Sequence, residues 1–448
     1  MNGGAASPAL DRRAIWAIAI PAMLTNVATA LIGLGDMWIV GRLNDAPTQG
    51  AVDVGARLFA ILFTVMNFLK TGTTGLVAQA GTRAGDDGGE NAQAELLARG
   101  LAIGFAIALA LLLAKPVLLP ALLGALGAEA NVLEAARTYA TIRYWSAPGV
   151  MLNLALMGFL IGRRQMVAVL WIEVAYNLLN VSLGYWLTLG LDWGIAGIGW
   201  SSFIAEYAKL GVLTLLVLRG SAARDILAAL TNRAVLRWEA IRPFLSTNRD
   251  LFLRTVVLML ALAALTRLSA ERGPDVLAAN GILYQLFVLT ALLLDGFENA
   301  AQVLNGERLG AQDRAGFAAY VRAILWRGLG AATLVALAFA LFADPVLASF
   351  AATDAVAREA QAQAIWLVII PFAGVASFVF DGVFVGASWT RAMLVSMGGA
   401  AVVYAISLWL TWPLGNAALW GSFVLFLLVR AGLQAALMPS RMRASFSS

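Results

Sequence analysis

The 448-residue chain contains no cysteine and no histidine. Without cysteine the chain forms no disulfides and has no thiolate nucleophile. Without either residue it also lacks the usual ligand sets for zinc and haem. Carboxylates are then the side chains best suited to carry a proton near neutral pH. These absences exclude most intramembrane zinc proteases and many membrane oxidoreductases, so we expect no enzymatic activity, no bound metal and no cofactor.

Charged residues are also scarce, at 13% of the chain, whereas 61% of the residues are hydrophobic. Soluble domains carry about 25% charged residues. The mean hydropathy is +0.81, and apolar runs recur from end to end, which predicts an all-α polytopic membrane protein. The start "MNGGAASPALDRRAIW" has no short apolar core followed by a cleavage site, so the first span is expected to be retained. The net charge of +5 fits basic inner loops and requires no nucleic-acid partner.

Runs of about 20 apolar residues are long enough to cross a bilayer as helices. Twelve such runs predict twelve transmembrane helices in two six-helix lobes. The expected spans are 14–40, 53–80, 92–122, 132–162, 166–190, 194–218, 248–270, 276–304, 315–345, 358–386, 392–412 and 415–437.

The basic residues predict the orientation, because cytoplasmic loops carry an excess of Lys and Arg. With twelve spans, basic clusters before span 1, after spans 4 and 8, in the long connection 219–247 and at the carboxyl end all lie on one side. We therefore expect a monomer in the bacterial inner membrane with both termini cytoplasmic. The connection separates an N-lobe, 1–218, from a C-lobe, 248–448.

Two sequence echoes indicate that the halves are parallel repeats, related by a pseudo-two-fold axis along the membrane normal, as in many transporters. At an offset of 225, Gly81, Arg83 and Gly85 match Gly306, Arg308 and Gly310. At an offset of 224, Gly158 and Gly162 match Gly382 and Gly386. The first offset places Lys70 opposite Asp295. The transport pathway is then expected between the two halves.

An ionisable residue inside an apolar span is a functional hypothesis by default. Asp36 stands in "GLGDMWIVGRL", about 22 residues into the first span, beyond a possible bend at Pro21. Low dielectric favours a neutral carboxylic acid, whereas a cationic ligand favours the ionised form. Proton and cationic substrate would therefore compete for Asp36, which is the simplest basis for antiport. The alternative is an interfacial aspartate that caps the end of the span.

Amides and hydroxyls on spans 5 and 6 are the next candidates. Asn177 and Asn180 are three residues apart and share one helix face. They could bond a protonated Asp36 or offer oxygens to a cation, and the alternative role is hydrogen bonding between helices. Ser201 and Ser202 are weaker candidates of the same kind.

The C-lobe carries a polar stripe on span 8, where Asp295, Glu298 and Asn299 stand at i, i+3 and i+4. An ion pair of Asp295 with Lys70 or with Arg254 could close a gate or only lock the bundle. The other residues weighed as cavity, gate or packing positions are Met37, Glu173, Glu206, Gln285 and Asp381. With Lys70 and Arg254 counted as the basic residues within the spans, the intramembrane charge is mainly acidic, which favours a cationic cargo.

The chain resembles multidrug and toxic compound extrusion (MATE) transporters, in the bacterial branch named for DNA-damage-inducible F (DinF). The resemblance covers nearly all of the chain and rests on "AIPAMLTNVATALIGLGDMWIVGRL", "FLKTGTTGLVAQAGTRAGD", "LLLDGFENAAQVLNGERLGAQ" and "FVFDGVFVGASWTRAM". It implies a V-shaped central cleft that opens alternately to each side. It also implies export of large, often cationic or amphipathic drugs, driven by inward flow of H⁺ or Na⁺ and conferring drug resistance.

In that family the span-1 aspartate, here Asp36, is the coupling and drug-binding carboxylate, and the span-5 asparagine is Asn180. Many relatives carry a second aspartate at the position of Gly184. Na⁺ prefers several oxygens, whereas a proton needs only Asp36 and a hydrogen-bond partner, so the sequence favours H⁺ over Na⁺. A flippase for lipid-linked precursors, from the same superfamily, is the other alternative.

Overall fold

The computed structural model describes residues 10–43, 46–83, 88–125 and 130–446, and these are helical with no strands. The helices run in chain order as α1 (Arg12–Gly41), α2 (Ala46–Met66), α3 (Phe68–Ala80), α4 (Gly88–Ala125), α5 (Ala130–Tyr144), α6 (Ala147–Gly162), α7 (Met166–Tyr185), the π-helix η1 (Trp186–Gly190), α8 (Gly194–Arg219), α9 (Ala223–Thr231), the 3₁₀-helix η2 (Arg233–Leu236), α10 (Trp238–Glu271), α11 (Pro274–Gly310), α12 (Arg314–Phe350), α13 (Asp354–Ala362), α14 (Ala364–Gly386), α15 (Thr390–Thr411), the 3₁₀-helix η3 (Trp412–Leu414) and α16 (Asn416–Ser445).

A helix is found at each of the twelve predicted spans, which confirms the all-α membrane architecture. Within the described residues, ten segments are long and apolar enough to cross a membrane, or eleven if α5 and α6 form one span bent by 48°. The remaining span is α1, with 30 residues. The bend between α5 and α6 precedes Pro148, whose ring disfavours a helical conformation at the residue before it.

Several boundaries differ from the sequence prediction. The second span is two helices, α2 and α3, which meet at Asn67. Helix α10 begins at Trp238, ten residues before the predicted start at 248. Its first turns contain Glu239, Arg242 and other polar residues, and such turns give no hydropathy signal.

The described residues form two compact units. One contains residues up to Met23, a short piece at residues 82–83, and the chain from Arg249 onward; the other contains Leu24–Gly81 and the chain from 88 to Asn248. Helices α1 and α10 therefore each contribute residues to both units. In α1 the change falls after Met23, two residues beyond Pro21, which lacks a backbone N–H.

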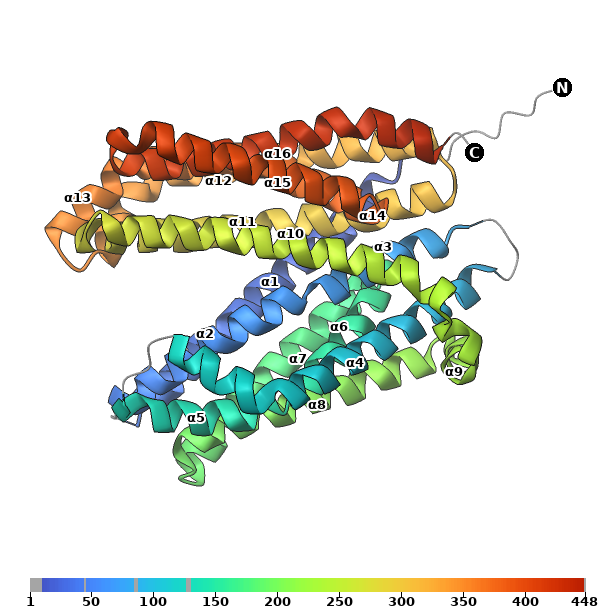
Figure 1. Ribbon diagram of the computed structural model, residues 1–448, viewed down its shortest axis with the longest axis horizontal. Coiled ribbons are helices and arrows are strands. Elements are labelled where there is room, and N and C mark those ends of the chain that lie inside the picture. The colour runs from blue at the N-terminus through green and yellow to red at the C-terminus, as the bar shows by residue number, and fades with distance from the viewer. Residues whose placement is uncertain (1–9, 44–45, 84–87, 126–129, 447–448) are drawn as a thin grey trace. The chain divides into compact units, whose positions relative to one another are not determined.

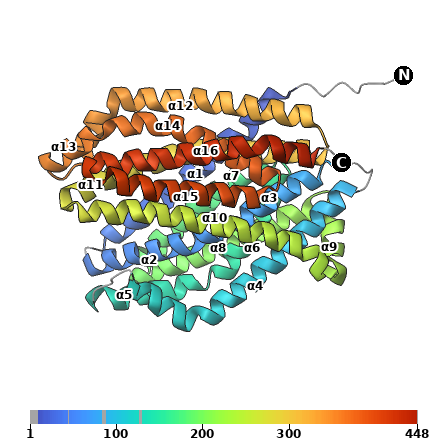
Figure 2. The ribbon, with the colours of Figure 1, turned by 45° about the horizontal axis from the view of Figure 1, so that its top comes forward.

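Within the unit that holds the C-terminal half, α14 packs between α11 and α12, and α15 lies beside α16 (Figures 1 and 2). An aromatic cluster fills its core, with Phe423 packed against Phe287, Trp420 and Phe426. Within the other unit, α6 packs on α3 and α4, α7 packs on α8, and α2 packs on α5. Phe59 there packs against Tyr139 and Tyr144. Large apolar side chains between helix pairs thus form a core in each unit.

The internal repeat is visible in how α6 and α14 end. Arg164 closes α6 with a φ of 60°, and Ser388 closes α14 with a φ of 57°. The three backbone hydrogen bonds around Arg164 recur around Ser388 with every donor and acceptor shifted by 224 residues. This is the offset that the glycine pairs in the sequence predict.

The paired glycines make equivalent contacts in each unit. A Cβ on Gly158 would lie 2.5 Å from the carbonyl oxygen of Lys70, and the same atom on Gly382 would collide with the carbonyl oxygen of Glu298. Gly162 and Gly386 likewise lie against the carbonyl oxygens of Thr74 and Gln302. Each of these glycines lets its helix backbone approach the backbone of the neighbouring helix closely.

These contacts correct one detail of the sequence alignment. Because Gly158 corresponds to Gly382, the residue equivalent to Lys70 is Glu298, at an offset of 228, and not Asp295 at an offset of 225. The first copy has three more residues than the second between this contact and the arginines Arg83 and Arg308. An alignment without gaps cannot register such an insertion.

We expect Gly382→Ala to destabilise the protein by about 1–3 kcal/mol, because its methyl group would overpack the contact of α14 with α11. The matched control is Gly398→Ala in α15, where a Cβ meets nothing within 4 Å and better helix propensity should leave stability equal or slightly higher. Thermal unfolding of both variants in detergent measures the difference. Equal melting temperatures for the two would contradict the packing argument.

Candidate functional site

Asp36 lies in the part of α1 that packs against α7. Its neighbour Gly35 faces Val181, and Ile39 lies over Gly184. The Asp36 side chain is only 4% exposed. Among the residues that the structure describes, its Oδ1 has no hydrogen-bond donor. Such an oxygen is costly unless a proton or a cation shares it, which distinguishes Asp36 from a solvated capping residue at the end of a span.

Asn180 lies one residue before Val181 on α7 and is 1% exposed. Its Nδ2 donates to the Oγ of Ser202 on α8 at 3.3 Å. Within the described chain its Oδ1 accepts no hydrogen bond, and both polar atoms of Asn177 are likewise without a partner. Ser201 donates to the carbonyl oxygen of Ile198 on its own helix and contacts Gly184. The contacts of Gly35 with Val181, and of Gly184 with Ile39 and Ser201, define a layer of α1, α7 and α8 that we call the Asp36 layer.

Arg143 on α5 interacts electrostatically with the Asp36 carboxylate. Its guanidinium also donates to the hydroxyl of Tyr139 and lies 5.1 Å from the ring centroid of Phe59. Arg143 belongs to the candidate site, although the sequence analysis did not single it out.

A second group of buried charges lies on α7 and α8. Lys209 places its Nζ 3.2 Å from Oε1 of Glu173 and 3.3 Å from Oε1 of Glu206. The same ammonium lies 4.1 Å from the ring centroid of Tyr176. Asn153 on α6 donates to Glu206 Oε1 at 2.7 Å. The Lys209 triad, formed by Lys209, Glu173 and Glu206, joins α7 to α8, and Asn153 connects α6 to it. The ammonium balances the charge of one of the two carboxylates.

We expect Lys209→Met to destabilise the protein by about 3–5 kcal/mol, because it leaves two carboxylates in the apolar interior without their cation. Lys209→Arg, which keeps the charge, should lose much less. Denaturation in detergent compares the variants. If Lys209→Met unfolds at the same temperature as Lys209→Arg, the ammonium does not balance the two glutamates.

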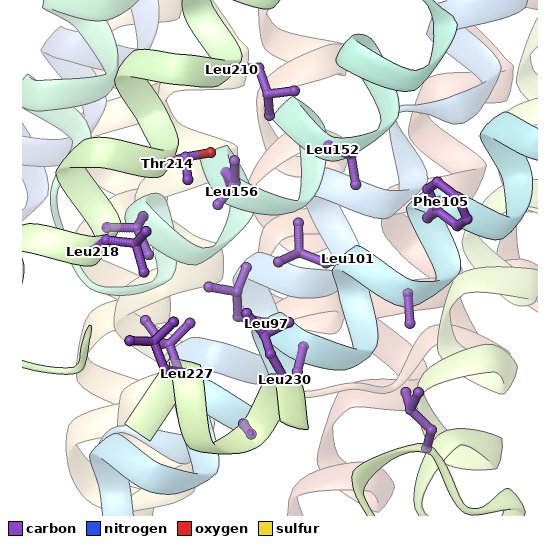
Figure 3. A pocket seen from close by; sticks show the side chains of 16 residues that line it. Leu97, Leu101, Phe105, Leu152, Leu156, Leu210, Thr214, Leu218, Leu227 and Leu230 are labelled. Atoms are coloured by element: carbon purple, nitrogen blue, oxygen red, sulfur yellow. The ribbon is translucent and has the colours of Figure 1, made fainter. Parts of the chain in front are cut away.

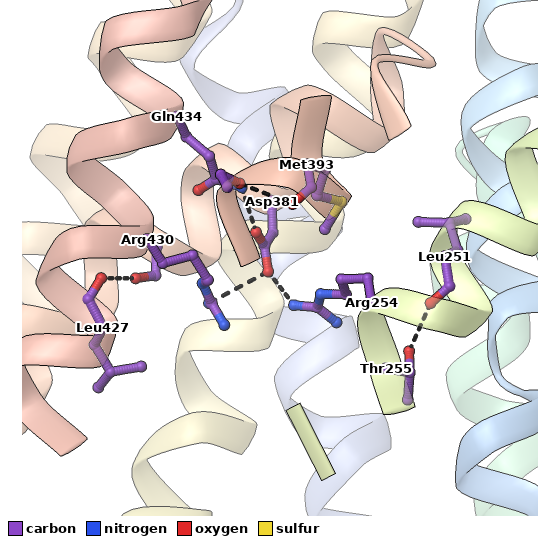
Figure 4. Close-up of polar contacts among 10 residues, drawn as sticks. Leu251, Arg254, Thr255, Asp381, Met393, Leu427, Arg430 and Gln434 are labelled. Atoms are coloured by element: carbon purple, nitrogen blue, oxygen red, sulfur yellow. Dashed lines mark hydrogen bonds and ion pairs between the residues drawn. The ribbon is translucent and has the colours of Figure 1, made fainter. Parts of the chain in front are cut away.

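In the C-terminal half, Asp381 on α14 is completely buried and is held by three side chains (Figure 4). Arg254 on α10 forms an ion pair with its Oδ2, and Arg430 on α16 approaches the same oxygen at 3.2 Å. Gln434 donates to Oδ1 at 2.6 Å. The Asp381 network therefore joins α10, α14 and α16. Its ion pairs and hydrogen bond stabilise the packing of these three helices.

The polar stripe on α11 lies beside this network. Asn299 donates to the backbone and to the carboxylate of Asp295, at 2.8 and 3.3 Å. Arg254 interacts electrostatically with Asp295 and Glu298 as well as with Asp381. Three acids and two arginines thus gather in one region of this unit. Arg254 forms an ion pair with Asp381, whereas the partner predicted for it from the sequence was Asp295.

Gln285 is exposed on α11, and Lys70 is half-buried on α3. The side chain of Met37 lies outside the described residues.

The prediction that the charged residues within the spans are mainly acidic is wrong, because it counted only Lys70 and Arg254 as basic. Arg143, Lys209 and Arg430 are also basic residues in membrane-spanning helices. Each lies beside at least one carboxylate: Asp36, the two glutamates of the triad, and Asp381. A usable signal was present for Lys209, which follows Glu206 by three residues on one helix face. The preference for a cationic cargo must therefore rest on Asp36 and its surroundings.

Comparison with known proteins gives the family. The model of the MatE family matches residues 21–186 and 251–410. The chain is 36% identical over 420 residues to DNA damage-inducible protein F of Escherichia coli K12. The alignment covers 93% of this chain and 90% of that protein.

Solved structures share the fold. A crystal structure of MATE in the bent conformation superposes with a TM-score of 0.82 at 18% identity, over 97% of this chain and 96% of that one. An outward-facing multidrug resistance MATE family transporter of the MOP superfamily gives a TM-score of 0.79 at 19% identity, over 98% and 97% of the two chains.

Proposed function

The chain belongs to the MatE family of membrane transporters, and on this premise we propose that it exports cationic and amphipathic compounds in exchange for protons. The observation that carries the proposal is the buried Asp36 carboxylate, whose Oδ1 finds no donor among the described residues. A proton and a cationic substrate would each satisfy this oxygen, and they cannot do so at once. Binding one then releases the other, which is the exchange that antiport requires.

Asn180 and Asn177 are proposed to support the exchange. Their oxygens accept no hydrogen bond within the described chain, so either can accept the hydroxyl of a protonated Asp36 or face a bound cation. Ser202 holds the Asn180 amide by accepting from its Nδ2, which leaves the oxygen free to point elsewhere. The role of these residues is to keep the site polar in both loaded states.

Protons are favoured over sodium as the coupling ion by the composition of this layer. By the family resemblance, Gly184 stands where many relatives carry a second aspartate, and it is packed against Ile39 and Ser201. A proton needs one oxygen and one acceptor, whereas sodium needs several oxygens around it.

Alternating access is proposed to use α1 near Pro21, which lacks a backbone N–H, because α1 passes from one compact unit to the other just beyond this residue. We further propose a monomer in the bacterial inner membrane with both termini cytoplasmic. Exposed arginines in the connection 219–247, such as Arg224 and Arg237, support this orientation.

Proteoliposomes with imposed gradients test the coupling ion. We expect ethidium to be driven uphill by a pH gradient in sodium-free buffer, and expect a sodium gradient at constant pH to be ineffective. Accumulation that follows only the sodium gradient would overturn the proton assignment. Lipid scrambling without any dye transport would instead support the flippase alternative.

A further inference from the structure

A cavity of about 480 Å³ lies among α4, α6 and α8 and is bordered by α9 and η2 (Figure 3). Fifteen of its sixteen lining residues are apolar, and the exception is Thr214. Leu101 and Leu152 line it from α4 and α6, and Leu210 lines it from α8. Ligand sites in proteins have volumes of about 300–1,000 Å³, so the cavity has room for a flexible aliphatic chain.

Helix α9, which borders the cavity, has apolar side chains on more than one side. Ile226 and Ala229 are buried where α9 packs on α4. Leu227 and Leu230 also line the cavity, yet they are 54% and 50% exposed. Leucines of a short helix that follows a transmembrane helix are typical of a segment lying in the membrane interface. Exposed leucines beside the cavity are suited to contact acyl chains.

Arginines occupy the neighbouring positions in the chain. Arg219 follows the lining residue Leu218, Arg224 stands two residues before Ile226, and Arg237 follows Leu236. All three are exposed, and none has an ion-pair partner among the residues that the structure describes. Each backbone lies within two residues of a lining residue, so the long side chains are able to reach the cavity rim. Long arginine side chains at an interface extend toward lipid headgroups.

We propose that this cavity binds one acyl chain of an anionic phospholipid, whose phosphate lies on the arginines at the rim. The apolar lining accepts the chain, and the three unpaired guanidiniums favour a headgroup with net negative charge over a zwitterionic one. Guanidinium groups match phosphate oxygens in geometry as well as in charge. The site is separate from Asp36 and does not depend on the transport mechanism.

Native mass spectrometry of the detergent-purified protein tests the proposal, with phosphatidylglycerol and phosphatidylcholine offered in turn. We expect one phosphatidylglycerol to remain bound under activation that strips phosphatidylcholine. Ala102→Trp fills the cavity from α4, and its matched control is Ala106→Trp, on an exposed face of the same helix outside the lining. The first variant should lower phosphatidylglycerol occupancy at least about tenfold, and the control should leave it unchanged.

The charge component is tested by the combined variant Arg219→Gln, Arg224→Gln and Arg237→Gln. It should remove the preference for phosphatidylglycerol, whereas Arg314→Gln, Arg322→Gln and Arg441→Gln at other exposed sites should keep it. Size-exclusion profiles verify that each variant is folded. Equal retention of the two lipids by the wild type, or full phosphatidylglycerol retention by Ala102→Trp, would overturn the proposal. So would displacement of the lipid by inorganic phosphate alone, or stronger retention of ethidium than of lipid.

Discussion

Asp36→Asn is expected to abolish uphill transport while leaving the protein folded. Asparagine has nearly the shape of aspartic acid and suits a buried polar layer, but it neither carries a proton nor attracts a cation. Gradient-driven ethidium transport in proteoliposomes should fall at least about a hundredfold, since the loss of one coupling charge removes about 3 kcal/mol or more of differential binding. Downhill leakage of dye should remain.

The matched control is Asp344→Asn, because Asp344 is an exposed aspartate on α12. It should transport at the wild-type rate. If Asp36→Asn drives ethidium uphill as well as Asp344→Asn does, then Asp36 is not the coupling residue. A melting temperature for Asp36→Asn equal to or above that of the wild type would show that lost transport is not lost folding.

Asp381→Leu is expected to be the most destabilising single substitution in the C-terminal half. It leaves the guanidiniums of Arg254 and Arg430 close together in an apolar interior without the carboxylate between them. Breaking a buried ion pair by removing one partner costs about 3–5 kcal/mol, and here two cations lose their partner at once. Thermal unfolding in detergent should show a large drop in melting temperature.

An exposed ion pair provides the control for this prediction. Asp53 and Arg57 on α2 approach to 2.9 Å with side chains that are 44% and 69% exposed, so Asp53→Leu should change stability by less than about 1 kcal/mol. The combination Asp381→Leu with Arg430→Met should recover part of the loss, because it removes one of the unpaired charges. Equal stability of Asp381→Leu and Asp53→Leu would mean that the network carries no net stabilisation.

The fold could be predicted because hydropathy alone decides it. An apolar run of sufficient length in a bilayer must be helical, since no water is available for unpaired backbone groups. The glycine pairs Gly158 with Gly382 and Gly162 with Gly386 also predicted equivalent helix contacts, because close backbone approach favours a residue without a side chain. Broken spans such as α2 and α3 were not predictable, since an apolar sequence continues through the break at Asn67.

The charge pairings could not be predicted for a different reason. Asp381 and Arg430 are 49 residues apart on different helices, and nothing local in the sequence records which faces meet. Arg143 reaches the Asp36 layer only through the packing of α5 in the same unit. Asp36 could be identified from the sequence because a single carboxylate is costly within an apolar helix. Its basic neighbour Arg143 could be identified only from the three-dimensional structure. Single basic residues within long apolar spans should therefore be weighed as carefully as acidic ones.

The central claim is that a proton and a cationic substrate compete for Asp36. The most direct measurement is proton release when ethidium binds to the purified protein in weakly buffered detergent solution. We predict about one proton released per ethidium bound at a pH where Asp36 is protonated, weaker ethidium binding as the pH falls, and neither effect in Asp36→Asn. Ethidium binding that releases no proton from the wild type, or releases as many from Asp36→Asn, would contradict the account.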